Sequence, residues 1–175
     1  MLKTSRSARG AVAAAAFIFA GNAFAEGAYT AELGIGQDTG KHVIQGDGRG
    51  NAHDPAFTAA FGYEMDSGLG GRVMAIGDFD VAKTFVPDQR SFDNFIGVQV
   101  TDKIKLANAF NLRGGIGIGR SNLEGDAAGH QLVTDGVLSL GLQWHPVPHY
   151  AMEVRVDHLT TTGTTVFGLQ FQVPF

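Results

Sequence analysis

The segment Thr164–Phe175 reads TTVFGLQFQVPF, and its pattern decides how the rest of the chain is interpreted. From Phe167 every second residue is large and apolar, while the residues between are small or polar. The apolar positions are Phe167, Leu169, Phe171, Val173 and Phe175. A period of two is typical of a β-strand whose two faces meet different surroundings. We therefore predict a final strand that ends in an aromatic residue.

The same alternation recurs in seven earlier segments, and together the segments predict eight strands. The earlier segments are 28–37, 55–65, 69–79, 91–101, 108–119, 132–144 and 150–158. The poorest is 69–79, because Met74 and Ile76 fall on its otherwise polar face. Strands of about ten residues are long enough to cross a membrane as a β-barrel.

The predicted connections alternate between long and short, as they do in outer-membrane barrels. Polar loops are expected at 38–54, 80–90 and 120–131, and short turns at 66–68, 102–106 and 145–149. The last of these is interpreted as a turn because Pro146 and Pro148 cannot donate to a strand ladder. An even number of strands places both ends of the barrel domain on one side of the membrane.

The amino terminus has the features of a secretory signal. Lys3, Arg6 and Arg9 precede an apolar run at 11–20, and Ala23-Phe24-Ala25 provides a small-residue cleavage pattern. We expect a signal peptide at 1–25 and a barrel domain at 26–175.

Composition excludes several classes of function. Removal of the three basic residues of the signal from the 13 in the chain leaves 10 Lys and Arg against 17 Asp and Glu. A net charge of −7 argues against nucleic-acid binding, which depends on basic phosphate contacts. The chain has no Cys, which excludes disulfides, thiolate metal sites and a thiol nucleophile.

Seven charged residues of the predicted strands fall on the faces made of small or polar residues. They are Glu32, Glu64, Arg72, Arg113, Glu153, Arg155 and Asp157. In a membrane barrel such faces point into the lumen, which in eight strands is only wide enough for the barrel's own side chains. Because buried charges without partners are costly, we predict a mutually paired charge network that plugs the lumen.

Aromatic residues lie near the ends of several predicted strands. They are Tyr29, Tyr63, Trp144, Tyr150 and Phe175. Membrane barrels carry aromatic girdles at both lipid interfaces, so we expect these residues to be shared between two girdles.

The alternating segments resemble the small outer-membrane β-barrels of the outer-membrane protein A type, in their barrel domain only. The matching stretches are AFTAAFGYEMDSGLGGRVMAIGDF (56–79), AFNLRGGIGIGR (109–120), LSLGLQWHPVPHYAMEVRVDHL (138–159) and TTVFGLQFQVPF (164–175). The resemblance implies an all-β, eight-stranded antiparallel up-and-down transmembrane β-barrel in the outer membrane of a Gram-negative bacterium.

The resemblance also implies partners. The aromatic carboxyl terminus is similar to the terminal signal of outer-membrane barrels, which assigns Phe171, Val173 and Phe175 to recognition by the barrel assembly machinery. Outer-membrane lipid and lipopolysaccharide would surround the barrel. We expect a monomer, because a closed barrel has no strand edge that demands a partner.

Histidine-containing motifs offer candidate chemistry, and each has a plainer interpretation. His158-Leu159-Thr160 is similar to the His-x-Ser pair of lipid A deacylase barrels, but Thr replaces Ser and no carboxylate is evident to orient the His. His145 and His149 only flank the predicted turn. A further group lacks the tight spacing of metal ligands: His42, Asp47, His53 and Asp54. We predict no catalytic, cofactor or metal site.

The pattern favours a structural or surface-interaction protein with a plugged interior and polar outer loops. A narrow pore for small solutes is the first alternative, and a lipid A-modifying acyl hydrolase is the second. Conductance separates the first alternative from the plugged barrel, and lipid A acylation separates the second.

Overall fold

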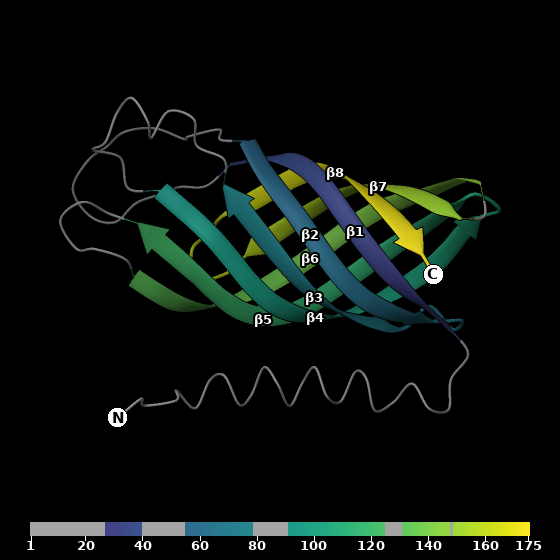
Figure 1. The fold of residues 1–175 in the computed structure, drawn as a ribbon, viewed down its shortest axis with the longest axis horizontal. Coiled ribbons are helices and arrows are strands. Elements are labelled where there is room, and N and C mark those ends of the chain that lie inside the picture. Colours follow the sequence, from purple (N-terminus) through teal and green to yellow (C-terminus); the bar gives the residue numbers. More distant parts are fainter. Residues whose placement is uncertain (1–26, 40–54, 79–90, 125–130, 148) are drawn as a thin grey trace.

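The computed structural model describes residues 27–39, 55–78, 91–124, 131–147 and 149–175. Within these ranges the chain forms eight antiparallel β-strands (Figure 1). They are β1 (Gly27–Asp38), β2 (Pro55–Met65), β3 (Gly70–Asp78), β4 (Ser91–Ala107), β5 (Phe110–Glu124), β6 (Gln131–Val147), β7 (Tyr150–Leu159) and β8 (Thr165–Pro174). No helix long and apolar enough to cross a membrane occurs in the described part of the chain. The predicted signal peptide at 1–25 lies outside the described residues.

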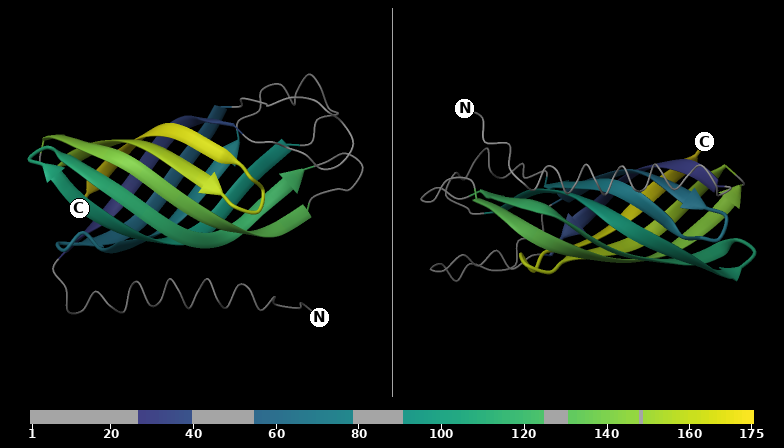
Figure 2. Two further views of the ribbon diagram at one scale, coloured as in Figure 1. Left: turned by 180° about the vertical axis from the view of Figure 1, so that it is seen from behind. Right: turned by 90° about the horizontal axis from the view of Figure 1, so that it is seen from below.

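The strands close into one barrel in sequence order, and β8 pairs with β1 to complete it (Figures 1 and 2). Paired residues followed once around the wall lead from Ala28 on β1 to Asp38 on the same strand, ten residues further along. The intermediate partners are Glu64, Gly70, Thr101, Gly115, Ser139, Asp157 and Val166. Such a stagger tilts the strands by about 40° and leaves an interior that side chains fill. The predicted eight-stranded up-and-down barrel is confirmed.

The two ends of the barrel differ in their connections. At one end, which we call the terminus end, β1 begins, β8 ends and the hairpins β2–β3, β4–β5 and β6–β7 turn (Figure 1). The β2–β3 turn is tight, because Gly68 adopts a φ of +94° and its N–H donates to the Met65 carbonyl at 2.9 Å. At the opposite end, the loop end, β1, β3 and β5 end and β7 turns into β8 at 160–164.

Side chains alternate between the lumen and the outer wall along each strand. On β1, Glu32 is 2% exposed while its neighbour Leu33 is 68% exposed. On β8, Gln170 is 1% exposed while Phe171 is 50% exposed. The polar face therefore points inward and the apolar face outward, as predicted. An outer surface of exposed Leu, Ile, Val and Phe is suited to contact with the hydrocarbon chains of a membrane.

The structure corrects three predicted boundaries. The predicted turn at 102–106 is wrong, because β4 continues to Ala107 and turns at 108–109. The loop predicted at 120–131 is shorter, because β5 runs to Glu124. Pro146 lies inside β6 rather than in a turn. The register shifts between Trp144 and Val147, and such an irregularity accommodates a proline without its ladder donor.

Candidate functional site: the barrel lumen

Glu32 lies at the centre of a charged cluster in the lumen, with its side chain 1% exposed. Its Oε2 atom accepts hydrogen bonds from Arg72 Nη1 at 2.6 Å and from Arg155 Nη1 at 2.8 Å. Its Oε1 atom accepts one from Arg113 Nη1 at 2.6 Å. These four residues come from β1, β3, β5 and β7, so one carboxylate joins four alternate strands across the barrel. Charge-assisted bonds of this kind are about twice as strong as neutral ones.

A second path of hydrogen bonds connects Arg72 to Arg155 along the inner wall. Arg72 Nε donates to Gln99 Oε1 at 2.8 Å, and Gln99 Nε2 donates to Ser139 Oγ at 2.7 Å. The Ser139 hydroxyl donates to the Asp157 carboxylate, which also accepts from Arg155 Nε at 2.9 Å. Because both arginines also bind the central carboxylate, the bonds form a closed ring. Each member therefore holds the next in position.

Arg113 extends the network toward the terminus end. Its Nη1 atom lies 3.2 Å from Glu153 Oε2, and its Nη2 atom lies 4.0 Å from Glu64 Oε2. Glu64 also pairs with Lys103, whose side chain is 23% exposed. The described lumen network holds four acids and four bases: Glu32, Glu64, Glu153, Asp157, Arg72, Lys103, Arg113 and Arg155. The formal charges of this network sum to zero, which limits the cost of burying them.

Lys103 is the member of this network that the sequence analysis missed. The segment 102–106 was predicted to be a short turn between two strands. The sequence did contain a signal for Lys103. It follows Gln99 and Thr101 at intervals of two residues, so the three lie on the same face of β4. Lys103 also lies opposite Arg113 in the register, which sequence alone does not reveal.

Inward glycines make room for the long polar side chains. A Cβ atom built on Gly34 would lie 1.9 Å from Gln170 Oε1, and one on Gly141 would lie 2.1 Å from Glu153 Oε1. Each of these side chains therefore occupies the space above a glycine of the neighbouring strand. The high glycine content of the predicted polar faces is explained by this packing.

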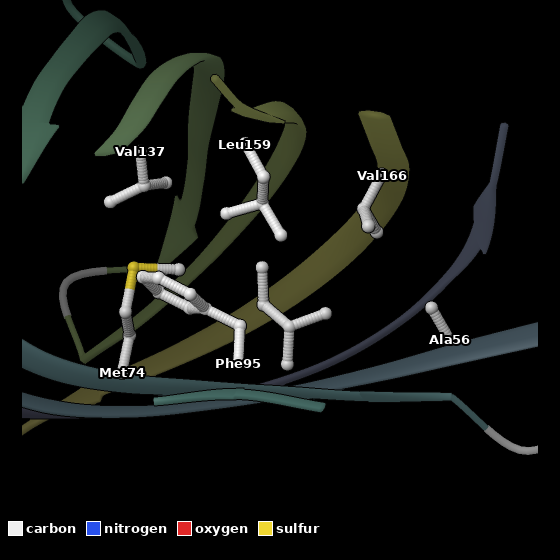
Figure 3. Packing of buried hydrophobic residues seen from close by; sticks show 7 residues of the cluster. Ala56, Met74, Phe95, Val137, Leu159 and Val166 are labelled. Carbon is white, nitrogen blue, oxygen red and sulfur yellow. The ribbon is translucent and has the colours of Figure 1, made fainter. Parts of the chain in front are cut away.

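Toward the loop end, the lumen holds a cluster of buried apolar side chains (Figure 3), beside the buried carboxylates of Asp38 and Asp135. Phe95 and Leu159 are 0% exposed, and Met74 and Ile76 are 1% exposed. The cluster, which we call the apolar plug, consists of Ala56, Met74, Ile76, Phe95, Val137, Leu159 and Val166. Met74 and Ile76 appeared as faults in the alternation of their strand. They point inward like the polar residues before them and serve the apolar plug.

His158 lies on the outer wall near the loop end, not in the lumen. Its Nδ1 atom is 2.9 Å from Thr165 Oγ1 on β8. Within the described residues this hydroxyl is its one hydrogen-bond partner, and no carboxylate orients the ring. The hydroxyl at His158 therefore belongs to Thr165, whereas the motif had suggested Thr160.

The other histidine candidates divide between described and undescribed residues. His145 Nε2 lies 2.8 Å from Gln143 Oε1 and 2.9 Å from Asn111 Nδ2, at the terminus end of the lumen. His149 is exposed in the β6–β7 turn. The loop candidates at 42–54 lie outside the described residues. No cluster of three metal-ligating side chains occurs in the ranges that the structure describes.

The five aromatic residues predicted to form girdles, Tyr29, Tyr63, Trp144, Tyr150 and Phe175, all lie at the terminus end. The Tyr29 ring stacks on Phe175 and on Phe61, with centroids 6.3 and 6.0 Å apart, and meets the Tyr63 ring edge-on at 5.2 Å. Trp144 and Tyr150 lie beside the β6–β7 turn. The expectation of two girdles is therefore wrong for these residues, because each of their strands has its aromatic end on the same side.

The proposed assembly residues lie on the outer wall of β8 and just beyond it. Phe171, Val173 and Phe175 are 50%, 41% and 68% exposed. The Phe175 N–H donates to the Tyr29 carbonyl at 2.9 Å, which continues the β1–β8 pairing by one residue. Their recognition by the assembly machinery stays a prediction.

Solved structures of small outer-membrane barrels share this fold. Neisserial surface protein A is similar with a TM-score of 0.60 and 13% identity, over 85% of this chain and 97% of that chain. Ail, the attachment invasion locus protein of Yersinia pestis, has a TM-score of 0.56 and 16% identity, over 85% of this chain and 97% of that one. The N-terminal β-barrel domain of Pseudomonas aeruginosa OprF has a TM-score of 0.60 and 12% identity, over 86% of this chain and 100% of that one. No protein-family model and no curated protein sequence matches the chain.

The class of protein follows from the closed register and these similarities. The chain has the fold of the small eight-stranded outer-membrane barrels, the barrel type found in outer-membrane protein A.

Proposed function

We propose that this protein is a non-conducting barrel of the bacterial outer membrane with a structural or surface-interaction role. The observation that carries the proposal is the filled lumen. The charged network occupies the half toward the terminus end, and the apolar plug occupies the half toward the loop end. An ion would have to displace both, and the two obstacles act in series.

The outer wall and the similar structures support the location and the role. The exposed Leu, Ile, Val and Phe of all eight strands form a surface suited to lipid. Two of the similar structures are described as a surface protein and as an attachment invasion protein. We infer that the barrel anchors its loop end at the cell surface, where the connections between strands meet the environment.

Recording from the purified protein in a planar bilayer tests this function. The plugged barrel predicts no regular conductance steps at concentrations that insert many barrels, with heat-modifiable gel migration of the same sample as evidence of folding. Large and regular steps would replace this proposal with the narrow pore. Surface labelling of a Cys introduced within 38–54 in intact cells tests the orientation, and labelling only after lysis would contradict it.

The enzyme alternative has its own test. His158→Ala removes the ring that approaches the Thr165 hydroxyl. We expect an unchanged lipid A acylation profile in cells that express this variant instead of the wild type. Loss of an acyl-chain cleavage that the wild type performs would establish a hydrolase.

A further inference from the structure

The outer wall has two rims of different chemistry, separated by the same number of residues on several strands. Thr39, Arg120, Thr134, Thr160 and Thr165 lie at the loop end. Each is ten residues along the chain from an outward-facing aromatic residue at the terminus end. In the same order these aromatic residues are Tyr29, Phe110, Trp144, Tyr150 and Phe175. An even separation keeps both members of each pair on one face of the wall.

Ten residues of tilted strand correspond to the thickness of a membrane. At about 3.3 Å per residue and a tilt of about 40°, ten residues rise about 25 Å along the barrel axis. The apolar band of outer-membrane barrels is about 25 Å tall. If the aromatic rim lies at one lipid interface, the residues at the loop end therefore lie at the other.

The rim at the loop end contains no Tyr or Trp in the described residues, although both occur at the terminus end. The chain's three Tyr and one Trp are Tyr29, Tyr63, Tyr150 and Trp144. The outward positions at this end include several threonine hydroxyls and, in the described residues, one guanidinium, that of Arg120. The asymmetry indicates that the two lipid interfaces require different contacts.

Arg120, Thr134 and Thr160 form one continuous patch on this rim, which we call the rim patch. Arg120 on β5 lies directly opposite Thr134 on β6, so their Cβ atoms are about 5 Å apart. The Thr160 N–H donates to the Gly136 carbonyl at 2.9 Å, and a Cβ on Gly136 would lie 2.8 Å from Thr160 Oγ1. The Thr160 hydroxyl therefore covers Gly136, two residues from Thr134 on the same face.

Arg120 differs from the other arginines that the structure describes. Arg72, Arg113 and Arg155 are buried and paired with lumen carboxylates. Arg120 is exposed and, within the described ranges, has no ion-pair partner. A guanidinium without a carboxylate partner on the outer wall is suited to binding an anion at the same depth in the membrane.

The turn that presents Thr160 is fixed by a buried carboxylate. Asp135 is 0% exposed and accepts from Thr161 N at 2.7 Å, Thr162 Oγ1 at 2.8 Å and Ser121 Oγ at 2.9 Å. Asp135 follows Thr134 directly and points to the opposite face. These hydrogen bonds to Asp135 fix the turn next to the rim patch, and a site that is already ordered loses less entropy when it binds a head group.

We propose that the rim patch binds a phosphate group on the head group of an outer-leaflet lipid, as lipopolysaccharide supplies. The Arg120 guanidinium donates to the phosphate oxygens, and the hydroxyls of Thr134 and Thr160 donate from the next two strands. The inference rests on the proposed location in the outer membrane and names the lipid contact made there. The aromatic rim would meet the opposite leaflet.

Binding of purified lipopolysaccharide to the refolded full-length protein in detergent micelles tests the proposal. Fluorescently labelled lipopolysaccharide and anisotropy give the dissociation constant. We expect Arg120→Gln to weaken binding about tenfold, which corresponds to the loss of one charge-assisted contact. Arg120→Lys keeps the charge and is expected to retain part of the affinity.

Two controls identify the group that is bound. Lys105→Gln removes an exposed cation at the terminus end and should leave the affinity unchanged. Chemically dephosphorylated lipopolysaccharide should bind wild type and Arg120→Gln equally. Inorganic phosphate at millimolar concentration should not displace the labelled lipid, because the acyl chains deliver the head group to the wall. Displacement by inorganic phosphate alone would show that the site binds free phosphate rather than a lipid head group, and would contradict the proposal.

The outcomes separate this inference from the proposed function. Equal affinity of wild type and Arg120→Gln for phosphorylated lipopolysaccharide would overturn the rim patch, provided that both migrate as folded barrels. The same result would leave the plugged barrel untouched. Regular conductance steps from the wild type would overturn the proposed function whatever the lipid affinity.

Discussion

The two halves of the lumen are filled by different kinds of side chain: a charged, hydrogen-bonded network toward the terminus end and an apolar cluster toward the loop end. Toward the terminus end, one carboxylate holds three guanidinium groups, and the space between them is filled by amide and hydroxyl side chains. Toward the loop end, the side chains of Met74, Ile76, Phe95, Val137, Leu159 and Val166 form an apolar cluster. Removing one partner of a buried charged pair is strongly destabilising, because the other charge is left buried without a partner. Shortening an apolar side chain costs stability in proportion to the volume of the cavity that it leaves. The comparison teaches that the first half specifies the register of the strands and the second half fills the barrel.

The largest effect is expected at the centre of the charged half. Glu32→Gln removes the charge shared by Arg72, Arg113 and Arg155, so three buried cations lose their main partner. We expect the free energy of unfolding to fall by about 3–5 kcal/mol. Urea titration of the barrel in lipid vesicles, read by gel migration, measures it.

Glu64→Gln is the matched control for this variant. Glu64 is partly exposed and lies at the edge of the network, so the loss should be smaller. An equal loss for the two variants would show that Glu32 has no central role.

The next effect is expected in the apolar half. Phe95→Ala leaves a cavity among Met74, Val137 and Leu159 and should cost about 3 kcal/mol. Ile96, the next residue, is 60% exposed on the outer wall, and Ile96→Ala should cost much less. The same urea titration compares the two neighbours, and a larger loss at Ile96 would contradict the inward assignment.

A smaller effect is expected where the charged half meets water. Lys103→Gln breaks the pair with Glu64, whose partners are both partly exposed. We expect a loss of about 1 kcal/mol, and high salt should reduce it because exposed pairs are screened. The loss from Glu32→Gln should not respond to salt. A salt response at Glu32 would mean that the charged half is wet.

The smallest effect on stability is expected at the carboxyl terminus. Deletion of Phe175 removes one backbone hydrogen bond and two ring contacts on the outer wall and leaves both halves of the lumen intact. We expect a large fall in assembled barrel in cells, with little change in the unfolding of barrels already assembled. The ratio of folded to total protein in membranes measures the first quantity. An unchanged ratio would remove Phe175 from the assembly signal.

The sequence predicted the fold well, because alternation and loop rhythm are local properties. Glu32 and Leu33 differ in type because they face different surroundings, and that contrast is visible in the sequence. The sequence does not show which charged residues form ion pairs with one another. Glu32 and Arg155 are 123 residues apart, and only the stagger of the closed barrel brings them to one height.

The apolar plug was hidden for a different reason. The prediction assumed that inward residues are polar throughout, so Met74 and Ile76 counted as errors in a strand rather than as members of a second region. The seven plug residues come from six strands, and none is unusual by itself. The aromatic residues were placed correctly at strand ends, but their distribution between the two interfaces follows from strand direction.

The claim that two unlike halves seal the lumen independently is tested most directly by conductance after each half is trimmed. Glu32→Ala with Arg155→Ala removes one acid and one base from the charged half, and Met74→Ala with Phe95→Ala opens a cavity in the apolar half. In planar bilayers we expect no regular steps from the wild type or from either double variant, and steps only from the fourfold variant. Regular steps from either double variant would show that one half alone closes the barrel and would contradict the account.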